Sequence, residues 1–385
     1  MKPLNYMIFF AVFFAVYGSF NFYLYIRGLQ ALPQQSHYRL VYIIAFIFFA
    51  SAFIIGRTLE NYWLCLFSKA FVWIGSFWLA GMIYFFFTVV LLDLIRLVNH
   101  FSPVYPLYIV EHYERIKLFT FLATIIVVVG VLFAGHINTL NPRIRELNLT
   151  ISKKAVGAKT LNIVAVSDIH LGTIIGKSRF DKIVSLINGL NPDIVLFPGD
   201  IVDEDLKPVI HDNLGESLRS IKTKYGVYAV TGNHEYIGGV TDAVKYLSEN
   251  GVRFLHDESV MINHTAYIVG REDRSASHFG GHRRKPLGEI MKEVDLQYPI
   301  LMMDHQPFGL REAVDAGVDL QLSGHTHDGQ IWPLNYITDA VYEKSWGYLR
   351  LDSTHIYISD GVGTWGPPVR IGNRPEIVHI TLNFD

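Results

Sequence analysis

Long apolar runs occupy the first third of the chain, and short apolar runs broken by polar clusters occupy the rest. The long runs are residues 6–26, 40–55, 71–95 and 118–135. Each approaches the roughly 20 residues that a helix needs to cross about 30 Å of hydrocarbon. A buried soluble helix normally shows a polar face every 3.6 residues, and these runs show almost none. The pattern therefore predicts four membrane-spanning helices within residues 1–136.

The third run is the least regular, because it contains Asp93 near its end and follows Lys69 and the segment "YWLCLF". A carboxylate inside a bilayer is costly unless it reaches the interface or pairs with a cation, and Arg96 stands three residues away. Four spans place both termini on one side. Near the helix ends, six Lys and Arg residues lie on that side and five on the other, which favours a cytoplasmic soluble domain by one charge.

After about residue 136, charged residues become frequent and the apolar runs shrink to strand length. Residues 137–160 read as a linker, in which "IRELNLTI" alternates like a first edge strand. Beyond it, "LNIVAV", "DIVLF", "YGVYAV", "YPILMM" and "VDLQL" each end abruptly in a polar cluster, and patterns such as "SRFDKIVSLINGL" have helical spacing between them. Strand, polar loop, helix and strand in this order predict an α/β domain over residues 161–385.

Composition narrows the function classes that fit this layout. The 385 residues are 50% hydrophobic and 18% charged, which suits a combined membrane and soluble protein. A formal net charge of −2 argues against a nucleic-acid partner. The single cysteine, Cys65, excludes a disulfide or a thiolate metal site within one chain. Any metal must therefore be held by His, Asp, Asn or Glu.

The polar clusters after five of the strands contain residues that can bind metals: Asp168, His170, Asp200, Asn233, His234, His305, His325 and His327. A lone His is more often a core residue than a ligand, and an Asp before a helix is more often an N-cap. Five such loops in one domain are hard to attribute to chance, because strand ends converge on one edge of a sheet. Mixed nitrogen and oxygen ligands suit Mn, Fe, Zn or Co. Two divalent ions are expected, with Asp200 able to bridge them.

The motifs "DIH", "GD", "GNHE", "DHQP" and "GHTH", in this order, resemble the signature of the calcineurin-like metallophosphoesterase family. The resemblance implies a four-layer α/β/β/α sandwich whose metal site hydrolyses phosphate esters or pyrophosphates through a metal-bridging hydroxide. It assigns Asp168, His170, Asp200 and His327 to one metal, and Asp200, Asn233, His305 and His325 to the other. It makes His234 a catalytic residue that stabilises the transition state or protonates the leaving oxygen.

Two carboxylates beside these motifs, Glu235 and Asp304, are candidates to orient the imidazoles, with a salt bridge elsewhere as the alternative. The tail "GVGTWGPPVRIGNRPEI" resembles that of a bacterial, often membrane-attached subgroup that includes YkuE- and YaeI-like phosphoesterases. Its Arg370 is expected to hold either a substrate phosphate or a backbone carbonyl.

The segment 271–286 combines basic residues with flexible glycines. It reads either as a solvated surface loop or as a cationic flap over the active site or against anionic lipid head groups. In the second reading Arg271, Arg283 and Arg284 join Arg370 as candidate substrate-binding residues.

These features predict an integral protein of the bacterial inner membrane that hydrolyses phosphorylated substrates. Four aromatic-rich spans exceed what tethering requires, which favours a lipid-linked substrate such as a UDP-diacylglucosamine or a phospholipid. The alternative is a membrane receptor or scaffold that binds a phosphorylated molecule without hydrolysing it. The complete set of metal-binding residues argues against this alternative. A transporter is a weaker alternative, since the spans show no paired broken segments.

Overall fold

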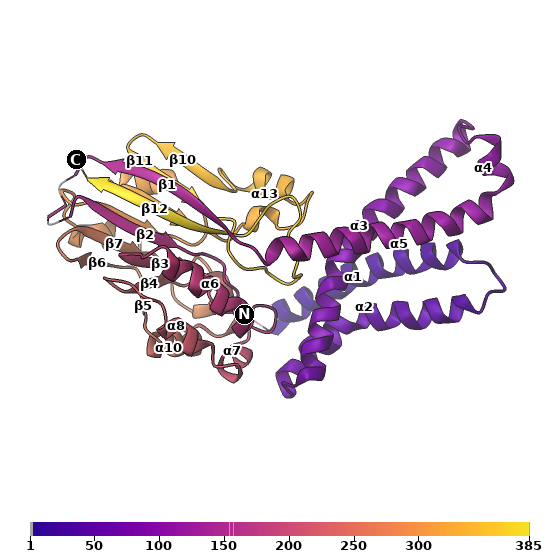
Figure 1. Ribbon diagram of the computed structural model, residues 1–385, viewed down its shortest axis with the longest axis horizontal. Coiled ribbons are helices and arrows are strands. Elements are labelled where there is room, and N and C mark those ends of the chain that lie inside the picture. The colour runs from indigo at the N-terminus through magenta and orange to yellow at the C-terminus, as the bar shows by residue number, and fades with distance from the viewer. Residues whose placement is uncertain (1–2, 154, 157, 385) are drawn as a thin grey trace. The chain divides into compact units, whose positions relative to one another are not determined.

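The computed structural model describes residues 3–153, 155–156 and 158–384, with side chains from residue 11 onward. The chain forms two compact units (Figure 1). The first runs from the N-terminus to His136 and includes Pro367–Val369. The second comprises Ile137–Gly366 and the remaining C-terminal residues. We describe each unit by itself.

The first unit is helical. Its helices are α1 (Pro3–Ala31), α2 (Tyr38–Tyr62), α3 (Leu66–Phe101), α4 (Leu107–Glu111) and α5 (Tyr113–Thr139). Within the described residues, α2, α3 and α5 are long and apolar enough to cross a membrane. The fourth expected span, 6–26, falls in α1, and the side chains of its residues up to position 10 lie outside the described part. Three candidate spans are therefore present, and the fourth stays a prediction.

Asp93, the carboxylate inside the third apolar run, is paired on both of its oxygens. Arg96 lies 2.9 Å from one oxygen, as predicted, and Arg27 of α1 lies 2.8 Å from the other. The hydroxyl of Tyr23 also donates to Asp93 at 2.6 Å. These three partners explain how the helix tolerates a carboxylate, because a paired and hydrogen-bonded charge costs far less to bury than an isolated one.

The second unit contains two six-stranded sheets. The first has the order β1-β12-β2-β3-β4-β5. Its strands are β1 (Arg143–Ile151), β12 (Glu376–Phe384), β2 (Thr160–Ala165), β3 (Ile194–Pro198), β4 (Val227–Val230) and β5 (Val252–Phe254). The edge strand β1 forms where the sequence alternates, and it pairs in parallel with β12. From β2 to β5 all neighbours are parallel, so their C-terminal ends share one edge.

The second sheet has the order β10-β11-β9-β8-β7-β6. Its strands are β10 (Gly347–Leu351), β11 (Thr354–Ile358), β9 (Leu320–Ser323), β8 (Ile300–Met303), β7 (Ala266–Gly270) and β6 (Glu258–Ile262). The central strands β11, β9, β8 and β7 are parallel, and an antiparallel strand closes each edge. The C-terminal ends of β8 and β9 therefore also share an edge.

The core lies between the two sheets. Alternate residues of β2 and β3, such as Ile163 and Leu196, belong to the same buried cluster as Leu301 of β8 and Leu322 of β9. Such alternation places every second side chain on the inner face of each strand. The next residue along β2, Val164, is also fully buried, so the outer face of the first sheet is covered as well.

Helices cover the outer faces of both sheets. The amphipathic helix α6 (Lys177–Gly189) buries an apolar stripe, and α6, α8 (Leu214–Arg219) and α10 (Val240–Glu249) lie along the first sheet (Figure 1). On the second sheet, Leu287 and Ile290 of α11 (Leu287–Ile290) and Ala313 of α12 (Arg311–Asp315) pack against Val269 and Met302. The layers are thus helix, sheet, sheet and helix, which confirms the predicted α/β class.

The remaining helical turns lie in the connections. They are α7 (Lys207–His211), α9 (Asn233–Gly238), η1 (Ala276–Gly280), η2 (Met291–Glu293), η3 (His327–Gly329) and α13 (Asn335–Val341). Two of them, α9 and η3, begin directly at predicted site residues.

Candidate metal centre

Five connections bring the predicted site residues to the shared edge of the two sheets. The loops after β2, β3 and β4 arise from the first sheet, and the loops after β8 and β9 arise from the second. All eight residues that the strand-end pattern singles out are in these loops. Their side chains are largely withdrawn from solvent; Asp168 and His305, for example, are fully buried.

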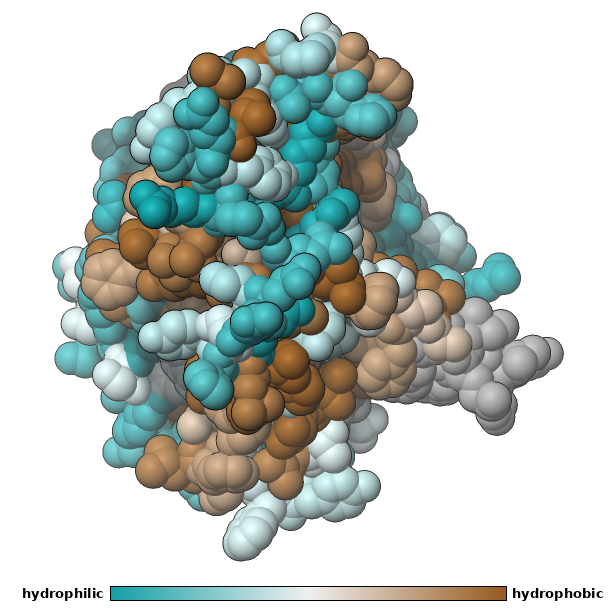
Figure 2. Space-filling view, turned by 90° about the vertical axis from the view of Figure 1, so that its right-hand side faces the viewer, coloured by the Kyte–Doolittle hydropathy of each residue, from teal (hydrophilic) through white to brown (hydrophobic). Residues whose placement is uncertain are grey.

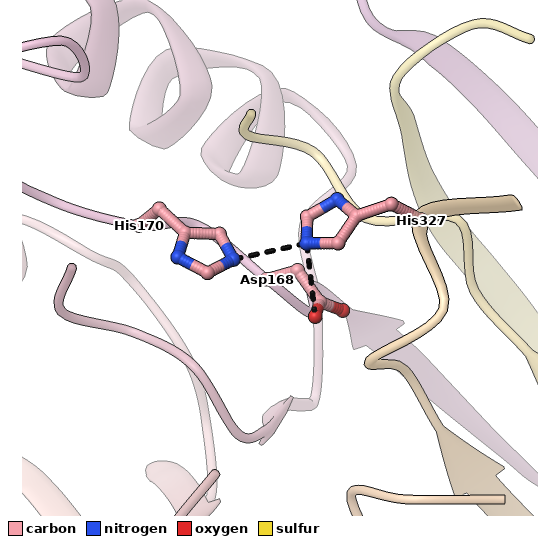
Figure 3. Close-up of side chains that lie close together, drawn as sticks. All are labelled: Asp168, His170 and His327. Atoms are coloured by element: carbon pink, nitrogen blue, oxygen red, sulfur yellow. Dashed lines mark hydrogen bonds and ion pairs between the residues drawn. The ribbon is translucent and has the colours of Figure 1, made fainter. Parts of the chain in front are cut away.

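The first group of potential ligands is Asp168, His170 and His327, each of which offers an atom within 4.8 Å of the others. The Nε2 atoms of His170 and His327 lie 3.0 Å apart, and the Nε2 of His327 lies 3.5 Å from Oδ1 of Asp168 (Figure 3). Two atoms bound to one ion at about 2.1 Å and at right angles would be about 3 Å apart, so this spacing fits a shared ion.

The second group is Asp200, His305 and His325. The Nε2 of His305 lies 3.1 Å from Oδ2 of Asp200 and 3.2 Å from the side-chain oxygen of Asn233. The other ring nitrogen of His305 lies 2.8 Å from the carbonyl of Pro198. That carbonyl can accept the Nδ1 proton, which leaves Nε2 with its lone pair facing the group.

Asp200 lies between the two groups. Its Oδ2 is 3.1 Å from His305 and 3.9 Å from Nε2 of His170, which belongs to the first group. Its Oδ1 accepts the backbone N–H of His234 at 2.9 Å, which fixes the carboxylate. A Cβ on Gly232 would overlap this carboxylate, so the glycine of "GNHE" provides the space that Asp200 occupies.

His234 is in neither of these groups, but with His170 and Asp203 it forms a third, buried set of potential ligand atoms within 4.8 Å of one another. Its Nδ1 lies 3.5 Å from Oδ1 of Asp203, and its ring packs edge-on against His170 with centroids 4.6 Å apart. Asp203 also lies 3.6 Å from Nδ1 of His170. Asp203 was not among the residues predicted from the sequence, although it follows Asp200 by three residues in the same strand-end loop. The spacing in "GDIVDED" was the available signal.

Burial and mutual charge shift the pKa values of the second group. Burial alone would raise the pKa of Asp200, but the neighbouring His305 and His234 outweigh it and hold that pKa well below its usual range. Burial opposes protonation of His305, yet Asp200 and Asp168 raise its pKa well above the ordinary value. Burial lowers the pKa of His325 to about 3.

In the first group, burial is outweighed only at His170, where Asp203 and Asp200 raise the pKa above its ordinary value. Burial raises the pKa of Asp168 and lowers that of His327 well below the usual value, with the charges of His170 and Arg370 adding to the effect on His327. His325 and His327 are therefore neutral at physiological pH. A neutral imidazole is the form that binds a metal.

The residues present fit divalent ions. They supply imidazole nitrogens and carboxylate and amide oxygens, gathered so that the donor atoms of each group lie within 4.8 Å of one another. Buried polar atoms gathered in this way need partners, which bound ions supply. This donor set suits Mn, Fe, Zn or Co.

The side chain of Arg370 is occupied by contacts within the chain and is not available to bind a substrate. It is fully buried, and its guanidinium donates to the carbonyls of Asp360, Gly361 and Gly363. Its Nη2 also lies 3.1 Å from Nδ1 of His327. Arg370 was expected to hold either a substrate phosphate or a backbone carbonyl, and the structure shows that it holds backbone carbonyls.

Salt bridges near both ends of the segment 271–286 connect it to the rest of the unit. Arg271 is buried and donates to Glu312 at 2.9 Å, and Arg284 donates to both oxygens of Asp304 at 3.0 and 3.1 Å. Asp304 therefore forms a salt bridge instead of orienting an imidazole. Arg283 is exposed.

Glu235 also has a different role from the one expected. Its carboxylate accepts the backbone N–H groups of Asp200, Val202 and Gly232 at 3.1, 2.9 and 2.7 Å. It thereby joins the loop after β3 to the loop after β4. The contacts of Glu235 match neither of its two expected roles, orienting an imidazole or forming a salt bridge, because its carboxylate holds backbone N–H groups instead.

Comparisons with known proteins agree on one family. The profile described as calcineurin-like phosphoesterase matches residues 161–329. An uncharacterized metallophosphoesterase of Aquifex aeolicus is 32% identical over 250 residues, covering 64% of this chain and 94% of that one. An uncharacterized metallophosphoesterase of Campylobacter jejuni is 26% identical over 384 residues, covering 98% of both chains.

A transmembrane protein with metallophosphoesterase domain from Bos taurus is 31% identical over 285 residues, covering 70% of this chain. This chain spans 62% of the length of that relative. Among solved structures, a dimetal phosphatase from Danio rerio aligns with a TM-score of 0.36 and 11% identity, covering 58% of this chain and 99% of that one.

Proposed function

Since the chain belongs to the calcineurin-like metallophosphoesterase family and is a membrane protein, we propose that it is a membrane-anchored, dinuclear-metal phosphoesterase. The observation that supports this most strongly is the pair of buried His and Asp groups with Asp200 between them. A degenerate, purely ligand-binding relative would be expected to have lost part of such a set.

The proposed ligands follow from these contacts. Asp168, His170, Asp200 and His327 would hold one ion, and Asp200, Asn233, His305 and His325 would hold the other. When bound, two divalent ions supply a water of lowered pKa as nucleophile and neutralise charge that develops at phosphorus.

His234 is proposed to donate a proton to the leaving oxygen or to stabilise the transition state. Its side chain is 6% exposed, and Asp203 is 3.5 Å from its Nδ1. A carboxylate at that position favours the tautomer with the proton on Nδ1 and fixes the ring. Asp203 therefore acts as a positioning residue for His234.

The proposed substrates are phosphate esters or pyrophosphates, with a lipid-linked compound such as a UDP-diacylglucosamine or a phospholipid as the leading candidate. The apolar helices support this candidate, because they hold the enzyme at the surface where such compounds occur. Of the four arginines expected to bind substrate, Arg271, Arg284 and Arg370 donate to groups of the chain itself, which leaves the exposed Arg283 as the remaining candidate. The proposed location is the bacterial inner membrane with the catalytic unit in the cytoplasm.

Activity of the purified full chain tests this proposal. With Mn present it should hydrolyse bis-p-nitrophenyl phosphate, a phospholipid or a nucleotide-lipid, and the Asp200→Asn variant should lose that activity. Hydrolysis of none of these compounds by a preparation that binds metal would leave the receptor alternative as the better account.

A further inference from the structure

The helical unit contains a cavity of about 580 Å³. This volume falls within the roughly 300–1,000 Å³ typical of ligand sites. Residues of α1, α2, α3 and α5 line it, and nearly all are apolar or aromatic, among them Phe49, Phe77, Trp78 and Leu132. Helix α3 contributes a stripe at helical spacing from Ile74 to Arg96, which covers about 33 Å of the helix. The stripe is therefore about as long as the hydrocarbon core of a bilayer is thick.

One end of this cavity is basic. Arg27, Arg96 and Lys117 line it there, and we call these three residues the basic rim. Asp93 pairs with both arginines, and Glu114 lies 2.8 Å from Lys117. Three cations against two carboxylates leave one net positive charge at the rim. Each guanidinium has five N–H donors, so the contacts to Asp93 leave donors for another acceptor.

An apolar cavity with a basic rim matches an amphiphile that has an apolar tail and one negative charge. Small residues such as Gly28 and Ala45 provide the space along the wall. The face of the molecule that Figure 2 shows carries hydrophilic residues among hydrophobic ones. We propose that the helical unit binds an anionic glycerophospholipid, with its acyl chains in the cavity and its phosphodiester at the basic rim.

This site is separate from the proposed hydrolysis. Lys117 is near the first residue of α5, whereas the chain continues to β1 from the last residue of α5, about 33 Å further along the helix. A helix that spans a bilayer places its two ends at opposite faces. The basic rim therefore lies at the face opposite to the C-terminal end of α5, and the residues that line the cavity include none of the proposed metal ligands.

Quenching of Trp78 tests the proposal directly, because this side chain lines the cavity. The full chain is reconstituted in phosphatidylcholine vesicles and titrated with either phosphatidylglycerol or phosphatidylcholine that has brominated acyl chains. The contribution of Trp78 is the difference between the wild type and Trp78→Phe. Half-maximal quenching should require roughly fivefold less brominated phosphatidylglycerol than brominated phosphatidylcholine, the effect expected of one basic contact at a membrane surface.

Two variants that each remove one positive charge distinguish binding at the basic rim from a general attraction of the protein for anionic lipid. Lys117→Gln removes a cation of the basic rim, and half-maximal quenching should then require nearly equal amounts of the two brominated lipids. Arg115→Gln removes an exposed cation two residues away that does not line the cavity, and it should keep the preference. Ala45→Leu partly fills the cavity and should reduce quenching by both lipids.

Equal quenching of wild-type Trp78 by the two head groups would overturn the proposal and indicate ordinary solvating lipid. Absence of Trp78 quenching by either lipid would also overturn it, and would indicate a cavity closed to lipid or covered by a second copy of the chain. The wild-type comparison decides the matter even where a variant fails to fold.

Discussion

At the scale of single residues, five of the candidate ligands have backbone in the left-handed region. They are Asp168, His170, Asp200, His325 and His327, with φ between 49° and 73°. Asp and His are among the non-glycine residues that adopt this region most readily, so the strain is modest. Left-handed residues cluster at functional sites because the surrounding packing holds them there. The identity of these residues was evident from the sequence, whereas their backbone conformation was not.

The first prediction follows from the different roles proposed for two neighbouring residues, Asn233 as a metal ligand and His234 as a proton donor. His234→Ala should lower kcat by about 10²–10⁴-fold, because it removes a proton donor while leaving both ligand groups intact. Metal analysis and kinetics of the same preparation check this. The exposed His211 provides the matched control, and His211→Ala should keep both metal content and kcat. Loss of an ion from His234→Ala would mean that His234 is a ligand.

Arg370 gives the second prediction. Its planar guanidinium serves three backbone carbonyls at once, which a lysine cannot reproduce. Arg370→Lys should therefore reduce the free energy of unfolding by roughly 2–4 kcal/mol, seen as a lower Tm. Arg350→Lys at an exposed position should change it by less than about 0.5 kcal/mol. Equal Tm values for the two variants would show that the carbonyl contacts contribute little.

At the scale of elements, strand ends were the most predictable feature. A short apolar strand that stops at a polar cluster indicates both the strand and the loop, and parallel strands bring those loops to one edge. The partners of Glu235 and Asp304 were not predictable, because they depend on which loops from different strands become neighbours. Asp203 could have been singled out by its position three residues after Asp200, but its contacts with both His170 and His234 depend on how their loops meet.

An ion pair between His256 and Glu272 holds the segment 271–286, and its strength depends on pH. His256 lies 2.9 Å from Glu272, and this contact raises the pKa of His256 above its ordinary 6.5. Burial alone would raise the pKa of Glu272, but His256 and Thr231 lower it from 4.5 to about 2. A raised histidine pKa stabilises the fold below pH 6.5, and a lowered carboxyl pKa stabilises it above pH 4.5. Both contributions are therefore largest between about pH 4.5 and 6.5.

The third prediction follows from this window. The Tm difference between the wild type and His256→Gln should be greatest near pH 5.5, and it should shrink as the pH rises through the raised pKa of His256. Thermal unfolding of the full chain between pH 5 and 8 measures it, with the exposed His278→Gln as a control. A difference that stays constant over this range would show that the pair makes no ionic contribution.

At the scale of the whole molecule, the apolar runs indicated membrane helices, and three of the four expected spans coincide with long apolar helices in the described residues. The pairing of Asp93 with Arg96 was predictable because the two residues are one helical turn apart. Its second partner, Arg27, is on another helix, so only packing reveals it. The cavity between these helices was not predictable, since it depends on how side chains from four helices leave space.

Titration of the metal-free full chain with Mn, followed by hydrolysis of bis-p-nitrophenyl phosphate, tests the central claim most directly. The two ligand groups predict that activity is absent without metal, rises with added ion and reaches its maximum at two bound ions per chain. Saturation at two bound ions without hydrolysis, or full activity with fewer than one ion per chain, would contradict a dinuclear phosphoesterase.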